Sequence, residues 1–182
     1  MRYFKKLVGE KCYLSPMNID DHEQYTEWMN DLEITSNLGN SGSVIALHTE
    51  KELLDKLSRS HNYAIIDKES DTLIGNCGFH KVNHEERNAE IGIFIGNKNF
   101  WDKGYGSEAM KLLMGYGFDY LNLRNIMLKV FSFNERGISA YRKCGFKEIG
   151  RRRNSLYMNG KEYDDVYMDI LDDEFRKLID KK

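Results

Sequence analysis

The chain has 182 residues, 41% of them hydrophobic and 31% charged, so it is long enough to bury one ordinary core and too evenly mixed for a disordered protein. Its formal net charge of −2 and pI near 6.2 give no basic footprint for nucleic acid, although such a chain can accept a cationic substrate. No apolar run reaches the roughly 20 residues of a membrane span, and the N-terminus lacks a signal peptide's apolar segment, so we expect one cytoplasmic domain over residues 1–182.

The chain begins with a predicted strand and a predicted helix. The strand alternates over residues 12–16 and ends at Pro16, the only proline. The helix follows over residues 19–31, where apolar side chains recur on one face, and Asp20 or Asp21 is expected to cap it.

A loop, a second helix and a hairpin come next. Residues 33–43 are rich in Ser, Asn and Gly and predict the loop. The helix is expected over residues 48–60, capped by Thr49. Two apolar runs within residues 62–83, joined by the polar turn 68–71, predict the hairpin.

The middle of the chain predicts a change from antiparallel to parallel pairing. Residues 88–96 read as a third strand after the hairpin, so three successive strands are expected to run antiparallel. A long amphipathic helix is expected over residues 105–121, and residues 125–133 then form a strand that returns parallel to the one before the helix. A cleft is expected where these two strands lie side by side.

The last third of the chain predicts a short helix and a second hairpin. The helix lies in ERGISAYRKCGF and ends at Gly145, a favourable C-cap residue. Two strands follow, joined through Asn159 and Gly160, which is a strong hairpin signal. Residues 172–182 are expected to form a terminal helix or a frayed tail.

A glycine loop joins the strand EIGIFIG to the long helix. Its sequence is GYGSEA, and Gly104 and Gly106 let the backbone approach a ligand without clashes from Cβ atoms. The first amides of a helix have no partners within the helix and lie at the positive end of its dipole. The loop therefore predicts a site for a phosphate group.

This loop and the later stretch NERGISAYRKCGFKEIG together resemble the GNAT superfamily of N-acetyltransferases. The family motif places Gln or Arg three residues before the first glycine, and Trp101 departs from it at that position. FWDKGYGSEA is similar to the form found in the branch related to the ribosomal-protein alanine acetyltransferases RimJ and RimL and to spermidine acetyltransferase. The resemblance covers nearly the whole chain and is much less specific for a substrate than for the family.

The resemblance implies a mixed α+β fold. Its central sheet has about seven mostly antiparallel strands flanked by helices, and one parallel pair is splayed to bind acetyl-CoA. It also implies that acetyl-CoA is the cosubstrate, without a metal, and that the acceptor is a protein N-terminal amine, a polyamine or another small amine. We expect no nucleic-acid or membrane partner, and a homodimer is one open oligomeric state. The alternative is an inactive acyl-CoA-binding module that regulates or scaffolds.

The resemblance also implies site residues. Tyr141 is expected to protonate the leaving thiolate, and Glu90 to act as a base through water. For both, packing or plain solvation is the competing interpretation. Coenzyme contacts are expected from the strand before the loop, from the loop itself and from the short helix: Ile93, Phe94, Ile95, Lys103, Gly104, Tyr105, Gly106, Ser107, Asn134, Ser139 and Lys143.

Other motifs in the chain favour less specific interpretations. GYGSEA also satisfies the dinucleotide-binding pattern GxGxxA, but too few βα repeats follow it, and the Gly-Lys-Ser/Thr of a phosphate-binding P-loop does not occur. The three cysteines lie far apart and are expected to be reduced and mostly buried. The five histidines form no metal-ligand pattern, and a minor role of His80 and His84 in substrate binding stays open. The arginines at 151–153 predict a solvated strand edge.

Overall fold

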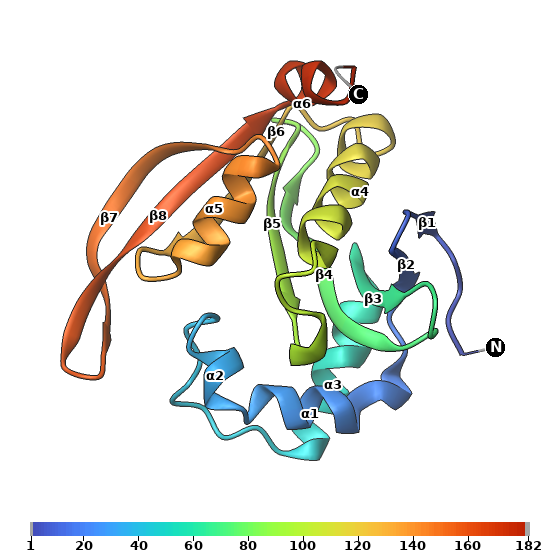
Figure 1. Cartoon of the computed structure of the whole chain (residues 1–182), viewed down its shortest axis with the longest axis vertical. Coiled ribbons are helices and arrows are strands. Elements are labelled where there is room, and N and C mark those ends of the chain that lie inside the picture. The colour runs from blue at the N-terminus through green and yellow to red at the C-terminus, as the bar shows by residue number, and fades with distance from the viewer. Residues whose placement is uncertain (1, 181–182) are drawn as a thin grey trace. The chain divides into compact units, whose positions relative to one another are not determined.

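A computed structural model describes residues 2–180 (Figure 1). The strands are β1 (Leu7–Val8), β2 (Cys12–Pro16), β3 (Asn62–Asp67), β4 (Leu73–Asn83), β5 (Asn88–Ile95), β6 (Asn125–Phe131), β7 (Lys147–Met158) and β8 (Lys161–Leu171). The helices are η1 (Ile19–Asp21), α1 (His22–Met29), α2 (Leu32–Thr35), α3 (Leu47–Ser58), η2 (Lys98–Phe100), α4 (Tyr105–Asp119), α5 (Glu135–Lys143) and α6 (Asp172–Ile179).

The sheet confirms the predicted α+β class. The strand order is β1-β2-β3-β4-β5-β6-β8-β7, with β5 and β6 parallel and most other pairs antiparallel. The described residues contain eight strands where about seven were expected, the additional one being the two-residue β1. Parallel pairing stops within three residues, at Glu90 opposite Met127, so in the described part of the chain the next residues of β5 and β6 do not pair with each other.

The chain divides into two compact units. The first contains Gly78 and the described residues before it, together with Ile93–Leu112. The second contains Phe79–Gly92 and the described residues from Leu113 onward.

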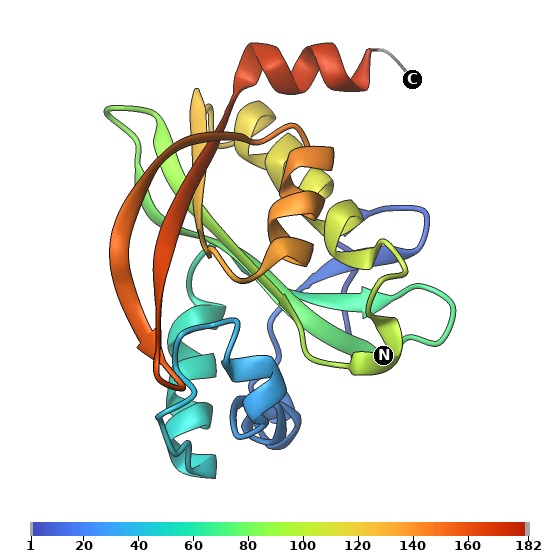
Figure 2. The ribbon, with the colours of Figure 1, turned by 60° about the vertical axis from the view of Figure 1, so that its left-hand side comes forward.

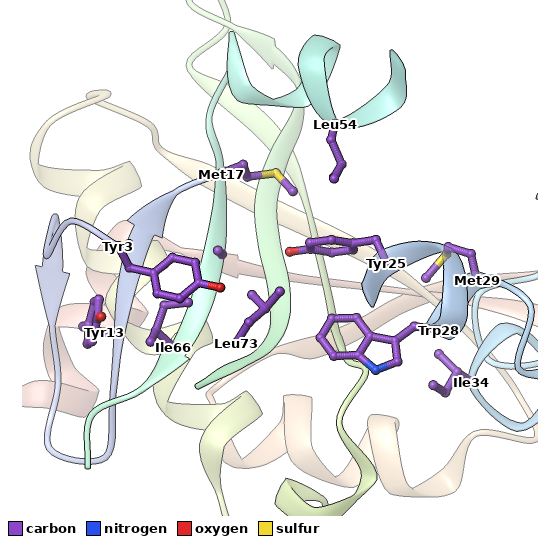
Figure 3. Close-up of a cluster of buried hydrophobic side chains, with 11 residues drawn as sticks. Tyr3, Tyr13, Met17, Tyr25, Trp28, Met29, Ile34, Leu54, Ile66 and Leu73 are labelled. Carbon is purple, nitrogen blue, oxygen red and sulfur yellow. The ribbon is translucent and has the colours of Figure 1, made fainter. Parts of the chain in front are cut away.

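In the first unit, buried strands pack under two helices. β3 is buried along its whole length and has a strand on each side. The helix α1 lies beside α3 (Figures 1 and 2). Figure 3 shows the resulting core, where the ring of Tyr25 meets that of Trp28 edge to face at 5.3 Å. The core residues are Tyr3, Tyr13, Met17, Tyr25, Trp28, Met29, Ile34, Leu54, Ala64, Ile66 and Leu73.

Three local predictions for the first unit were wrong. Asp21 stands at the α1 N-cap without a capping bond, because its side chain accepts a hydrogen bond from Tyr3 instead. α3 begins at Leu47 after Ala46, so Thr49 lies inside the helix rather than at its cap. The expected loop contains the one-turn helix α2, which Asp31 caps by accepting from an amide of the first turn at 2.9 Å.

In the second unit, burial follows position in the sheet. Alternate residues of β6 and β8 are buried, whereas β7 is the edge strand and is exposed over most of its length, as predicted for the arginines at 151–153. β7 and β8 form a long curved hairpin (Figure 2). Asn159 and Gly160 take positive φ values of 53° and 77°, and Gly145 follows α5 with φ 98°, so both turn predictions are confirmed.

The structure also describes the cysteines, the groups that could bind a metal and the helices that could span a membrane. Cys12, Cys77 and Cys144 are buried free thiols. Within residues 2–180 no three His, Cys, Asp or Glu side chains are grouped to hold a metal ion, and no helix combines the length and apolar character needed to cross a membrane.

Candidate active site

The glycine loop leads directly into the first turn of α4. The amide of Glu108 donates to the Gly104 carbonyl at 3.1 Å, and Gly104 has φ 85°, a backbone that other residues rarely adopt. Gly106 has room for a side chain on the protein side, since an added Cβ would lie 3.8 Å from Ile95 and 3.9 Å from Ile93. Both are ordinary contacts, so the fold itself does not require glycine at position 106.

The loop is held in place by the turn between β1 and β2. The Glu108 carboxylate accepts from the amides of Lys11, at 2.9 Å, and Cys12, at 3.3 Å. A Cβ on Gly9 would lie 2.0 Å from this carboxylate, so Gly9 permits the close approach. Lys11 Nζ also donates to the Lys103 carbonyl at 2.8 Å. The acidic side chain of the first helical turn is thus bound to the hairpin, and two lysines lie at the loop.

The first residue of α4 is hydrogen-bonded to the last residue of β3. The Tyr105 hydroxyl donates to Asp67 at 2.7 Å, and this hydrogen bond raises the pKa of Tyr105 to about 12. Burial alone would raise the pKa of Asp67, but donors from Ser70 and Tyr105 hold it below its usual value. The phenol of Tyr105 is therefore occupied, which leaves its main-chain amide as the group it can offer a ligand.

The end of β5 presents two different faces. The Phe94 ring packs edge to face against Tyr25 at 6.2 Å and against Trp28 at 6.0 Å, so it belongs to the core. Ile93 and Ile95 lie under the first turn of α4. The indole nitrogen of Trp101 donates to the Ile95 carbonyl at 2.8 Å. Trp101, the residue that departs from the family motif, thus ties the loop to the strand that precedes it.

In the second unit, Glu90 is paired with a lysine. Lys81 Nζ lies 2.8 Å from Glu90 Oε2, and the Lys81 backbone has φ 50°. The Glu90 side chain is 24% exposed, so water reaches it although one oxygen is engaged. The expected base is therefore a partly accessible carboxylate in an ion pair.

Asn134 stands at the N-cap of the short helix α5. The Asn134 side-chain oxygen accepts from the Gly137 amide at 2.8 Å, which caps the helix. Tyr141 is half-buried on α5 and packs edge to face with Phe146 at 6.2 Å. Burial raises the pKa of Tyr141 to about 12. Its hydroxyl therefore stays protonated at neutral pH, as a proton donor must.

The predicted site residues divide between the two units. The loop and the end of β5 lie in the first, and Glu90, Asn134, Tyr141 and the exposed α5 residues Ser139 and Lys143 lie in the second. Sequence reasoning did not find the residues that fix the loop, Lys11, Asp67 and Glu108. Their partners are up to 97 positions away, and no local pattern carries such a signal.

Comparison with known proteins identifies the family. The family model of the acetyltransferase (GNAT) domain matches residues 11–147 of this chain. An uncharacterized N-acetyltransferase of Bacillus licheniformis is 33% identical over 167 residues, covering 89% of this chain and 93% of that protein. Spermidine N(1)-acetyltransferase of Escherichia coli is 31% identical over 155 residues, covering 80% of this chain and 83% of that protein.

A solved structure shows the same fold. It is the crystal structure of spermidine N-acetyltransferase from Vibrio cholerae in complex with CoA and spermine. It superposes with a TM-score of 0.83 at 24% identity, covering 92% of this chain and 99% of that one.

Proposed function

Because this chain belongs to the GNAT acetyltransferase family, we propose that it moves the acetyl group of acetyl-CoA to a primary amine by direct attack of the amine on the thioester. The family match over residues 11–147 carries this proposal, since that range includes both the glycine loop and α5. The chain is an N-acetyltransferase; the coenzyme, the acceptor class and the role of each residue are what we propose.

The glycine loop fits the pyrophosphate of the coenzyme. The amides of the first turn of α4 lie at the positive end of the helix, and no side chain at Gly104 or Gly106 obstructs them. Lys103 is exposed at the loop and adds a positive charge, and the Ser107 hydroxyl adds a donor. Acetyl-CoA, when bound, supplies the activated acetyl group.

The other coenzyme contacts come from β5 and α5. Main-chain groups of residues 93–95 pair with the pantetheine arm as an additional strand would, although the Ile95 carbonyl is already used by Trp101. Asn134 caps α5 through its side-chain oxygen, and its side-chain nitrogen contacts the same arm. Ser139 and Lys143 add polar contacts.

Tyr141 is the proposed acid. A thiol has an ordinary pKa of about 8.5, far below the value of about 12 for Tyr141, so the phenol keeps its proton until the thiolate forms. It hydrogen-bonds the leaving sulfur and donates to it as negative charge develops there during cleavage of the carbon–sulfur bond.

Glu90 is the proposed base. An alkylamine carries a proton near neutral pH and must lose it before attack. The free oxygen of Glu90 accepts this proton through a water molecule, and the ion pair with Lys81 keeps the carboxylate in place. The names of the spermidine acetyltransferase relatives support a small alkylamine, such as a polyamine, as the acceptor.

Release of free thiol from acetyl-CoA, measured against a panel of amines, tests the proposal. Amine-dependent thiol release is expected, with acetylated amine as the second product. Binding of coenzyme A without release for any amine would instead indicate a module that binds the coenzyme without turnover. Absence of both binding and release would refute the proposed function.

A further inference from the structure

The strand β4 departs from regular alternation at Lys81. In a regular strand, consecutive side chains point to opposite faces of the sheet. Lys81 lies inside β4 but has a left-handed backbone, with φ 50°, which is uncommon outside glycine and breaks the alternation. Irregularities of this kind re-aim side chains and are frequent beside active sites. The consecutive residues His80 and Lys81 are therefore able to serve the same face.

Both side chains reach one face of the neighbouring strand β5. Lys81 Nζ lies 2.8 Å from Glu90 Oε2. The His80 ring lies over Gly92, where an added Cβ would be 2.8 Å from Nε2 and 3.3 Å from Cδ2. Glu90 and Gly92 stand two residues apart on β5, so they share a face at a spacing of roughly 7 Å. The imidazole thus occupies the space that a side chain at position 92 would take.

His80 covers the residue that joins two parts of the proposed site. Glu90, two residues before Gly92, is the proposed base. Residues 93–95, directly after Gly92, are proposed to pair with the pantetheine arm. His80 is exposed, so solvent and a small amine can reach its ring. The imidazole therefore lies between the proposed base and the segment that holds the thioester.

Acetylation of an alkylammonium removes two protons from its nitrogen. The first leaves before the amine attacks, and Glu90 accepts it. The second leaves the tetrahedral intermediate, whose nitrogen carries a positive charge after it has bonded to the thioester carbon. Tyr141 gives one proton to the sulfur, so each turnover releases one proton to solvent. The second proton of the nitrogen requires an acceptor besides Glu90.

Among the basic groups at Glu90, the imidazole suits this second transfer. The hydrogen bond to Glu90 raises the pKa of Lys81, and Tyr167 of β8 raises it further, so Lys81 stays an ammonium and accepts no proton. Imidazoles gain and lose a proton between about pH 5 and 8, which is the range in which an acceptor must be recycled. His80 is thus the neighbouring side chain that can take a proton and release it to solvent.

We propose that His80 accepts the second proton from the nitrogen of the tetrahedral intermediate. The inference rests on the proposed amine acetylation and adds a catalytic residue to it. The N–H bond breaks and its electron pair stays on nitrogen. The carbonyl re-forms as the carbon–sulfur bond breaks, and its electron pair leaves on the sulfur that Tyr141 protonates. His80 and Glu90 then give their protons to solvent, and Tyr141 regains one.

Removal of the imidazole tests its role. With the fastest amine of the panel, His80→Ala should lower kcat by ~10²-fold, and added imidazole should restore turnover in proportion to its unprotonated fraction. His80→Gln keeps a polar group over Gly92 without a base, so it should lose as much as His80→Ala. His48→Ala is the control, since the His48 side chain is 83% exposed on α3. Neither loss nor rescue is expected for it.

A matched pair of amines separates the two protons. Ethylamine is an ammonium near neutral pH, whereas the fluorines of 2,2,2-trifluoroethylamine withdraw electrons and leave it mostly unprotonated. The fluorinated amine has no first proton to give up but must still lose the second. Glu90→Gln should lower kcat/KM by ~10²-fold for ethylamine and by less than about 3-fold for the fluorinated amine, whereas His80→Ala should lower both by ~10²-fold.

Several results would overturn the inference. They are wild-type turnover in His80→Ala or His80→Gln, a loss that imidazole does not restore, and a loss in His80→Ala confined to ethylamine, which would place His80 on the first proton. If the wild type acetylates no amine of the panel, the proposed function itself fails. If it does acetylate an amine and His80→Ala keeps the rate, the inference alone fails.

Discussion

Substitution of Gly106 separates coenzyme binding from folding. Gly106→Ala and Gly106→Val add one and three carbons beside the amides of the first turn of α4, where the pyrophosphate is proposed to lie. On the protein side the added Cβ meets Ile95 at 3.8 Å and Ile93 at 3.9 Å, both ordinary contacts. Ala replaces Gly in a helix with a gain of up to ~1 kcal/mol, so the Ala variant should be no less stable than the wild type.

The expected loss of coenzyme affinity follows from the contacts displaced. A hydrogen bond to a charged group contributes ~1.5–3 kcal/mol, so loss of two amide contacts to a phosphate weakens binding by at least ~100-fold. The Val variant should show this loss in full and the Ala variant an intermediate one. Titration calorimetry with coenzyme A gives the affinity, and thermal unfolding gives the stability of each variant.

Gly115→Ala is the matched control for Gly106. It lies in the same helix, and its added Cβ would also make only ordinary contact, 3.9 Å from the Phe175 ring. This variant should bind coenzyme A as the wild type does. Wild-type affinity in Gly106→Val, with the protein folded, would refute the role of the loop, and equal losses in both variants would attribute the effect to the helix.

Three further outcomes are expected. Tyr141→Phe should lower kcat by ~10²-fold or more with little change in coenzyme affinity. Because burial raises the Tyr141 pKa to about 12, ionisation of this group should not lower the wild-type rate near neutral pH. Wild-type turnover in the Phe variant would mean that Tyr141 only packs the helix. Glu90→Gln should lower kcat, and the loss should shrink as the pH rises toward the amine's own pKa of about 10, whereas an unchanged pH–rate profile would exclude Glu90 as the base. Gly96→Ala should lower the unfolding free energy by about 1–3 kcal/mol in a denaturant titration, because its Cβ would lie 2.1 Å from the Trp28 ring, and unchanged stability would mean that the ring moves freely.

Local signals predicted most of the elements. The hairpin turn at Asn159 and Gly160 and the helix end at Gly145 require positive φ values, which few residue types adopt easily, so sequence alone located them. The parallel pairing of β5 with β6 followed from the helical crossover that connects the two strands.

The wrong predictions concern polar residues that can bind either a nearby amide or a partner distant in the chain. Asp21 looked like a helix cap, but its carboxylate is bound by Tyr3, 18 residues earlier in the chain. The helix α2 forms in a Ser- and Asn-rich stretch because a single Asp31 cap is enough for one turn. A partner distant in the chain also decides the role of Glu108, the acid of the first turn of α4, which binds the β1–β2 hairpin.

The bond between Glu108 and the Lys11 amide also bears on the order of folding. It joins residues 97 positions apart, and such distant contacts form slowly because a long loop must close first. On a ribosome the β1–β2 hairpin is made early but cannot meet its partner until synthesis has passed the first turn of α4. We therefore expect refolding experiments to show helical signal before coenzyme A binding is regained, with the capacity to bind among the last properties to return.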